Sequence, residues 1–350
     1  MRATVIHGER DVRLEEVPDP ALSGTGTDAI VRVVAACVCG SDLWRYRGVN
    51  PVREPARIGH EFVGVVEQIG DRVEKIRVGD FVIAPFYDCD MTCANCRNGF
   101  SPSCLEHGAW GGRDHWGNPV DGAQGEYVRV PHADGSLVAT PEQPADELVP
   151  HLLTLADVFG TGHHAAVAAG VGPGRTVVVL GDGAVGLSGV LASRRLGAER
   201  IVLMSRHAPR QALGREFGAT DVIEARGDEG VAAVKELFDG IGADCVLECV
   251  GTGAAMEQAI ASARPGGQVG FVGVPAEGNA VPVRRLFNTN VGLRGGVAPV
   301  RNYLDELLPE VWRGELQPGR VFDLTLPLAE VGEAYAAMDE RRAIKVLLQP

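Results

Sequence analysis

The chain has 350 residues, of which 45% are hydrophobic and 23% are charged, and this balance is ordinary for a globular protein. A single compact core rarely holds a chain of this length, so two domains are expected. The formal net charge of −13 argues against nucleic acid or an anionic membrane as a partner, because phosphate binding needs clustered Lys and Arg.

The start of the chain predicts a cytoplasmic protein. The stretch "MRATVIHGERDVRLEEVPDP" interrupts its apolar residues with charges, which is unlike a secretory signal. No uncharged apolar run of about 18 residues occurs, so no membrane span is expected. Thiols stay reduced in the cytoplasm, so the eight cysteines are expected to be metal ligands, catalytic groups or buried residues rather than disulfides.

The first part of the chain is rich in short β-type runs bounded by Gly, Pro or Asp. These runs cover residues 29–38, 61–70, 80–86 and 125–131. Such spacing predicts an irregular, mostly antiparallel β domain.

From about residue 150 onward, strand and helix patterns alternate. A strand, a Gly-rich turn and a helix over 176–198 are followed by predicted strands at 200–205, 221–224, 243–251 and 267–275, with predicted helices at 209–219, 230–238 and 254–266. This alternation is typical of a doubly wound parallel sheet, so the fold class is α/β. After this alternation the chain has a predicted helix over 302–316 and a predicted strand over 343–350. Their pattern resembles that of the first part of the chain. We predict a catalytic domain of 1–155 and 296–350 and a cofactor domain of 156–295.

The sequence "VVVLGDGAVG" places Gly181, Gly183 and Gly186 between a strand and a helix. The first glycine permits a tight turn, the second lets backbone approach a pyrophosphate, and the third lets helix and strand pack closely. Ala184 and Val185 open the helix, whose N-terminus attracts phosphate charge. We predict a dinucleotide site here; the alternative is a tight structural turn.

The end of the next strand indicates which nicotinamide cofactor fits. NAD sites place an acid there for the ribose hydroxyls, but this chain has Ser205 followed by Arg206. A hydroxyl and a guanidinium bind a 2′-phosphate, which a carboxylate would repel. NADP(H) is therefore preferred over NAD(H), with His207 and Arg210 as helpers. The alternative is a solvated loop and an enzyme that takes NAD.

Several further motifs carry a resemblance to a known family. They are "CGSD", "GHEFVGVV", "VGDFV", the cysteine lobe (residues 88–104), "LADVFGTGHHA", "GDGAVG", "ECVG" and "GGQVGFVG". Over essentially its whole length the chain resembles the zinc-dependent alcohol dehydrogenases of the medium-chain dehydrogenase/reductase (MDR) superfamily. The resemblance implies a GroES-like catalytic domain, a Rossmann cofactor domain, hydride transfer between an alcohol/carbonyl pair and NAD(P), and a homodimer or homotetramer.

By this resemblance Cys39, His60 and Asp157 hold a catalytic zinc. Relatives often have Cys at the last position, and Asp is also a sound zinc ligand. Three protein ligands leave one position open, where zinc polarises the substrate oxygen as a Lewis acid. The alternative for Asp157 is a helix cap.

The resemblance also assigns roles beside that metal. Glu61 resembles the residue next to the zinc, Asp42 is placed to orient His60 through a hydrogen bond, and Ser41 matches the hydroxyl that takes the substrate proton. Trp44 occupies the position at which many relatives have a His that passes the proton on. Water is therefore the expected carrier that takes the proton from the site to solvent.

Further cofactor contacts follow from the resemblance alone. Thr161 matches a residue near the nicotinamide, and Val250 lies in the "ECVG" motif. Lys345 resembles a basic residue that reaches the pyrophosphate.

The cysteine lobe matches the family's second, closed zinc site, in which the metal is structural. Cys93, Cys96 and Cys104 have the expected spacing, and the fourth ligand is expected at Asp90. Cys89 lies one place earlier, and we favour it slightly because thiolate is the usual fourth ligand. The alternatives are Asp90 as ligand, or a disulfide.

The substrate pocket is expected to be walled by Trp44, Trp110 and Trp116, which favours an apolar or aromatic carbonyl compound. Two other functions remain open. One is a zinc-free enoyl or quinone reductase of the same fold. The other is a zinc-ribbon binding module without dehydrogenase activity.

Overall fold

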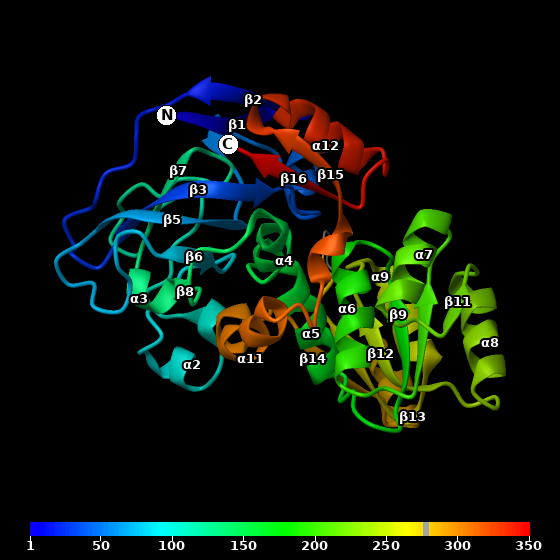
Figure 1. The fold of residues 1–350 in the computed structure, drawn as a ribbon. Coiled ribbons are helices and arrows are strands. Elements are labelled where there is room, and N and C mark those ends of the chain that lie inside the picture. The colour runs from blue at the N-terminus through cyan, green and yellow to red at the C-terminus, as the bar shows by residue number, and fades with distance from the viewer. Residues whose placement is uncertain (276–279) are drawn as a thin grey trace. The chain divides into compact units, whose positions relative to one another are not determined.

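A computed structural model describes residues 1–275 and 280–350. Its contacts divide the chain into two compact units, Met1–Asp157 with Pro299–Pro350, and Val158–Ala298. Figure 1 shows the first unit in blue through green for its first segment and in orange and red for its second, because the end of the chain returns to the unit that contains its beginning.

The first unit is built on two sheets. The seven-stranded sheet has the order β15 (Phe322–Pro327), β16 (Lys345–Gln349), β3 (Ala29–Cys37), β5 (Phe62–Ile69), β6 (Phe81–Ala84) and β8 (Val138–Ala139), with β7 (Tyr127–Val130) paired to β3. The three-stranded sheet has the order β2 (Asp11–Glu16), β1 (Arg2–Gly8) and β4 (Ala56–Arg57). Short helices flank them: α1 (Asp42–Tyr46), α2 (Ala94–Arg97), α3 (Ala133–Ser136), α4 (Val149–Thr154), α11 (Val300–Trp312) and α12 (Val331–Asp339).

Strand β3 is the centre of this unit, and it carries the chain towards the site described below. It is rich in β-branched and small apolar residues, nearly all of them buried, which suits a strand covered on both faces. It pairs antiparallel with β5, so that Ala36 lies opposite Phe62. The residues just after β3 and just before β5 are therefore neighbours in space.

The second unit is one parallel sheet with helices. The strand order is β11 (Asp221–Ile223), β10 (Arg200–Met204), β9 (Thr176–Leu180), β12 (Ala243–Glu248), β13 (Ala263–Phe271) and β14 (Gly292–Gly295). The helices are α5 (Val158–Ala168), α6 (Ala184–Arg195), α7 (Ala208–Phe217), α8 (Gly227–Leu237), α9 (Gly253–Ser262) and α10 (Val283–Thr289). The α/β fold predicted from the sequence, an irregular and mostly antiparallel β domain with a doubly wound parallel sheet, is confirmed.

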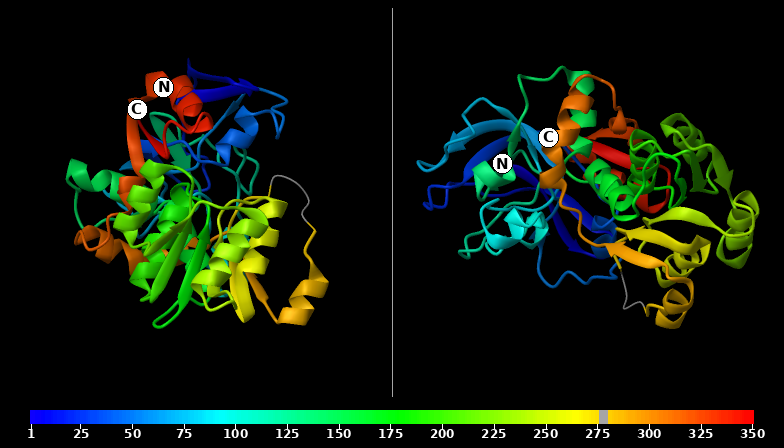
Figure 2. Two further views of the ribbon diagram at one scale, coloured as in Figure 1. Left: turned by 90° about the vertical axis from the view of Figure 1, so that its right-hand side faces the viewer. Right: turned by 90° about the horizontal axis from the view of Figure 1, so that it is seen from below.

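The connections of this sheet explain its layers. The chain moves outward from β9 through β10 to β11, and then crosses back to β12 and β13. Right-handed crossovers in the two directions put the helices on opposite faces. Accordingly α5, α6 and α7 pack side by side, and α8 packs on α9. Figure 2 gives two further views of these elements.

Several element boundaries differ from their predictions, and the end of one helix shows a reason. The pattern predicted a helix over 254–266, but α9 ends at Ser262 and β13 begins at Ala263. Ala263 pairs with Ala243 of β12, so sheet pairing overrides the helical pattern there. Within the described residues, no helix has the length and apolar character needed to cross a membrane.

Candidate active site and zinc centres

One of two groups of metal-binding side chains found among the described residues lies where β3 ends and β5 begins. Cys39, His60, Glu61 and Asp157 each offer a ligand atom, and these atoms lie within 4.8 Å of one another. The Cys39 Sγ and the His60 Nε2 lie 3.8 Å and 3.6 Å from the Asp157 Oδ2. Residues far apart in the sequence therefore converge on one point.

Local structure explains the convergence. Cys39 follows β3, and His60 precedes β5, the strand that pairs with β3. Gly59 has φ +101°, a backbone conformation that favours glycine and turns the chain just before His60. The Phe86 N–H donates to the Ala156 carbonyl (3.0 Å) and so fixes the segment that carries Asp157.

The cluster is largely closed to water. Cys39, Glu61 and Asp157 are 9%, 0% and 7% exposed. Burial raises the pKa of the Cys39 thiol, so a metal that binds there displaces its proton.

Lys345 has a different partner from the one predicted. It is 1% exposed, and its Nζ donates to the Glu61 Oε1 (2.8 Å) and to the Val38 carbonyl (3.2 Å). The resemblance predicted that it reaches a cofactor pyrophosphate, but its ammonium is used inside the first unit. Burial raises the pKa of the Glu61 carboxyl, and the Lys345 charge opposes that rise. The second Glu61 oxygen is buried and has no hydrogen-bond partner within residues 1–275 and 280–350.

Asp42 and Ser41 both contact the metal-binding residues. The Asp42 Oδ1 lies 3.4 Å from the His60 Nδ1, and its Oδ2 accepts the Cys39 backbone N–H at 3.0 Å. The Ser41 hydroxyl donates to the Cys39 Sγ at 3.2 Å. One carboxylate thus orients both a ligand ring and the backbone of a second ligand.

A pocket of about 220 Å³ opens beside this cluster. Ser41, Arg45, His60 and Trp110 are among its lining residues. Of the three tryptophans expected at the substrate, only Trp110 borders this pocket. Trp44 lies under the Arg47 guanidinium (5.8 Å), and the half-exposed Trp116 packs on His132, with ring centroids 4.8 Å apart. Arg45 was not among the predicted pocket residues, because nothing in the sequence places its side chain.

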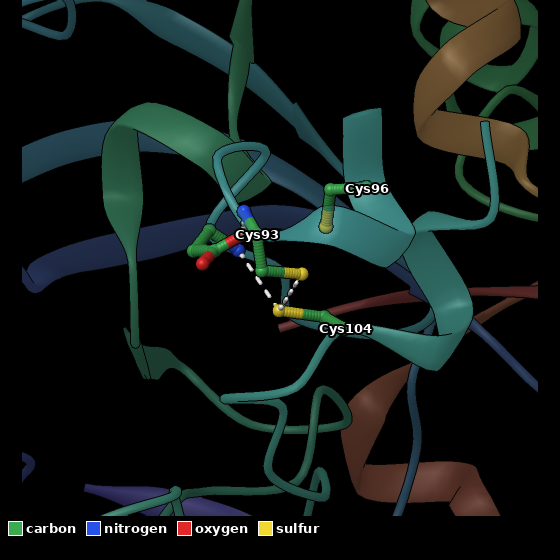
Figure 3. Close-up of side chains that lie close together, drawn as sticks. Cys93, Cys96 and Cys104 are labelled. Atoms are coloured by element: carbon green, nitrogen blue, oxygen red, sulfur yellow. Dashed lines mark hydrogen bonds between the residues drawn. The ribbon is translucent and has the colours of Figure 1, made fainter. Parts of the chain in front are cut away.

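The second cluster lies in the cysteine lobe. Asp90, Cys93, Cys96 and Cys104 bring one ligand atom each within 4.8 Å of the others. Figure 3 shows the three sulfur atoms turned towards one another, with the Cys93 Sγ 3.9 Å from the Cys104 Sγ. Burial opposes ionisation of Asp90, but N–H groups of Cys93 and Thr92 hold the pKa of its carboxyl below the usual range. Asp90 is therefore the fourth metal-binding side chain that the structure brings to the three cysteines.

The structure groups Asp90, and not the slightly favoured Cys89, with the three cysteines. Cys89 is fully buried, and its thiol faces the Gly135 carbonyl (3.7 Å). Its backbone N–H donates to the Ser136 Oγ (3.1 Å), which ties it to α3. The Cys89 thiol faces the core, while the Asp90 carboxylate lies with the three sulfurs.

The dinucleotide turn lies in the second unit, between β9 and α6. Gly181 has φ +110°, and a Cβ on Gly186 would lie 2.0 Å from the Gly181 carbonyl oxygen. Both positions therefore require glycine. Gly183 precedes the first helical residues, Ala184 and Val185, and a Cβ there would meet nothing within 4 Å. The space beside Gly183 is the gap that an approaching phosphate needs.

Ser205 and the neighbouring cations have protein partners. The Ser205 hydroxyl donates to the Asp182 Oδ2 (2.8 Å), and the Arg210 Nη1 lies 3.5 Å from the Asp182 Oδ1. The Arg206 Nε donates to the Glu224 carbonyl (3.0 Å), and the His207 N–H donates to the Ser205 Oγ (3.3 Å). An acid is therefore present beside Ser205, although none follows β10 in the sequence. Asp182 was missed because it comes from the turn after β9, where Leu180 pairs with Met204.

Two further residues that were predicted to contact the cofactor, Val250 and Thr161, lie in this unit. The Val250 N–H donates to the buried Glu248 Oε1 (2.8 Å), and a Cβ on Gly181 would lie 3.1 Å from the Val250 Cγ2. Val250 therefore adjoins the dinucleotide turn. Thr161 is buried in α5.

Comparison with known proteins identifies the family. The alcohol dehydrogenase GroES-like domain matches residues 25–142, and the zinc-binding dehydrogenase domain matches residues 184–313. A probable zinc-binding alcohol dehydrogenase of Mycobacterium tuberculosis is 36% identical over 346 residues, which cover 97% of this chain and 86% of that protein. The chain belongs to the zinc-binding alcohol dehydrogenase family of the MDR superfamily.

Other alcohol dehydrogenases are similar to this chain over nearly its whole length. Zinc-type alcohol dehydrogenase B of Aspergillus flavus is 33% identical and covers 100% of this chain and 81% of its own length. The solved alcohol dehydrogenase of Thermus sp. ATN1 has a TM-score of 0.90 and 34% identity, covering 100% of this chain and 99% of that one. Benzyl alcohol dehydrogenase of Acinetobacter calcoaceticus has a TM-score of 0.86 and 25% identity, covering 99% and 98%.

Both clusters of this zinc-dependent alcohol dehydrogenase have donor sets that fit zinc. Thiolate, imidazole and carboxylate are its usual protein ligands, and tetrahedral sites use four of them. Cys39, His60 and Asp157 supply three such donors next to a pocket, and the cysteine lobe supplies four. Both groups are therefore candidate zinc sites.

Proposed function

We propose that this enzyme transfers hydride between NADP(H) and an alcohol/carbonyl pair at the Cys39, His60 and Asp157 cluster. The observation that supports this most is the convergence of these three ligands beside a pocket, in a chain of the zinc-binding alcohol dehydrogenase family.

The residues of the first unit have distinct roles in this proposal. Cys39, His60 and Asp157 would hold the zinc, which when bound supplies Lewis-acid polarisation of the substrate oxygen. Ser41 lines the pocket, and its hydroxyl takes the substrate proton. Asp42 orients His60, and the Lys345 ammonium neutralises Glu61 beside the ligands.

Chelation and a substrate panel test the proposal. Complete removal of zinc is expected to abolish oxidation of alcohols and reduction of aldehydes, and zinc alone is expected to restore both. Turnover is measured with NADPH and NADH in parallel. Activity that survives in metal-free protein would instead mean a zinc-free reductase.

The substrate class proposed from the sequence is an apolar or aromatic alcohol or carbonyl compound. Trp110 in the pocket supports it, and a similar structure is a benzyl alcohol dehydrogenase. Arg45 adds a cation to the same pocket. The panel therefore pairs benzyl alcohol with carboxybenzyl alcohol, and a preference for the anion would correct the apolar assignment.

The preference for NADP(H) is supported by the cations around Ser205. Arg206 is exposed at the end of β10, and no acid occupies the position that NAD enzymes use. Asp182 works in the opposite direction, because its carboxylate lies against Ser205 and repels a 2′-phosphate.

The substitution Asp182→Asn is expected to strengthen the preference for NADPH. The amide oxygen can still accept the Ser205 hydrogen bond, while the negative charge is removed. Two like charges about 4 Å apart repel by roughly 1–4 kcal/mol at a partly hydrated site, so kcat/KM for NADPH is expected to rise roughly tenfold, with little change for NADH. Steady-state kinetics with both cofactors measures it.

Asp239→Asn is the matched control. This acid lies between α8 and β12, at the opposite end of the parallel strands from the dinucleotide turn. It is expected to leave both cofactors unchanged. A wild-type preference for NADH, or an Asp182→Asn variant with an unaltered cofactor ratio, would contradict the NADP assignment.

The remaining proposals concern assembly and location. Strand β14 ends the six-stranded sheet and has no outer neighbour among the described residues. A second copy could continue the sheet there, which supports a homodimer or homotetramer. The thiols that both zinc centres need favour the cytoplasm.

A further inference from the structure

Behind the His60 and Asp42 pair lies a buried glutamine with no role in the mechanism so far. Gln124 is 0% exposed and lies a few residues before β7. Its Nε2 donates to the Asp42 Oδ2 (3.3 Å) and to the Cys37 carbonyl (3.1 Å). Both N–H bonds of the amide are therefore used, one of them on the carboxylate that orients His60.

The other end of the same amide is held by Tyr335. Its hydroxyl donates to the Gln124 Oε1 at 3.1 Å, and Tyr335 is itself fully buried in α12. A flipped amide would place its oxygen against a carboxylate and a carbonyl, so these partners determine its orientation. A continuous chain thus runs from Tyr335 through Gln124 and Asp42 to His60.

Gln124 also supports the backbone that carries His60. A Cβ on Gly59 would lie 2.5 Å from the Gln124 Cγ, so the side chain packs directly on Gly59. The Gln124 N–H donates to the Ile58 carbonyl (3.1 Å) and the Ala123 N–H to the Gly59 carbonyl (2.9 Å). The same residue therefore holds His60 through its backbone and through its ring.

We propose that Gln124, locked by the Tyr335 hydroxyl, is a positioning residue that sets the zinc affinity of the catalytic cluster by holding Asp42 and His60. Partners of a ligand imidazole fix its orientation, and their loss typically costs about 10–100-fold in metal affinity. The inference rests on the proposed catalytic zinc. It assigns a role to Gln124 and Tyr335, which act on that site through Asp42 and His60.

The test measures zinc affinity at each site separately. Zinc-loaded protein is titrated with a competing chelator, and the isotherm that is missing from a Cys39→Ala variant is assigned to the catalytic site. Gln124→Leu keeps the bulk of the side chain and removes its hydrogen bonds. It is expected to weaken the catalytic site by about tenfold or more, and Tyr335→Phe is expected to weaken it several-fold.

The structural zinc serves as an internal reference, because general destabilisation would weaken both sites together. The matched control is Thr4→Val, since the buried Thr4 hydroxyl has no hydrogen-bond partner among the described residues, and its backbone N–H donates to the Gln124 carbonyl. That variant is expected to bind zinc as the wild type does.

The possible results separate clearly. A loss confined to the catalytic isotherm supports the inference. Unchanged affinity in both variants, or a parallel loss at both sites, overturns it. If Gln124→Leu fails to fold, Tyr335→Phe decides the question alone. A wild-type protein without a catalytic isotherm would overturn the proposed function itself.

Discussion

Replacing Cys39 by alanine is expected to remove the catalytic zinc and to lower kcat/KM by at least about 10³. The thiolate is one of only three ligands proposed there, and the remaining imidazole and carboxylate form a weak site. A catalytic metal contributes several kcal/mol of transition-state stabilisation, and about 1.4 kcal/mol corresponds to a factor of ten. Elemental analysis and steady-state kinetics measure the two effects.

The control is Cys245→Ala, which removes another buried thiol, on β12 and outside both ligand clusters. It is expected to keep full zinc content and activity. In the Cys39→Ala protein the cysteine lobe should still hold its own ion. Full activity in a Cys39→Ala protein would show that the chemistry does not use this cluster.

The second large effect is expected from Asp90→Asn. Asparagine keeps an oxygen for the Thr92 and Cys93 N–H groups, so the local turn persists while the charged ligand is lost. Zinc affinity of the lobe is expected to fall by at least about 100-fold, because loss of a direct ligand exceeds the loss of an outer partner. The melting temperature should fall with it, since a structural zinc contributes folding free energy.

Cys89→Ala is the matched comparison, because the two residues are neighbours that face opposite sides. It removes a thiol that contacts the Gly135 carbonyl and should leave the zinc in place. The reverse result, in which Cys89→Ala loses the metal and Asp90→Asn retains it, would restore the ligand set first favoured from the sequence. Chelator competition and thermal melting distinguish the two outcomes.

Much of the fold followed from local patterns. The apolar run at 29–38 became β3, and the alternating segments from 176 onward became the parallel sheet, because their periodicity and bounding glycines act locally. The end of α9 was predicted too late, because pairing of Ala263 with β12 decides that boundary. Periodicity carries no information on such long-range pairing.

Some residues of the candidate site could likewise be predicted from the sequence, and others could not. Cys39, His60 and Asp157 were expected from motifs, and their convergence needed the pairing of β3 with β5. Asp182 was not expected, because only the neighbouring ends of β9 and β10 place it against Ser205. Gln124 and Tyr335 were missed because they belong to no motif and meet only in the folded core.

By itself the sequence indicated the family and the dinucleotide turn, since these follow from short motifs, and the family resemblance named Cys39, His60 and Asp157 as candidate zinc ligands. The tertiary structure decided which of two adjacent residues faces the three sulfurs of the cysteine lobe. It also decided that Lys345 pairs with Glu61. Both outcomes depend on the direction of a side chain, which is set by packing against distant segments such as α3 and β5.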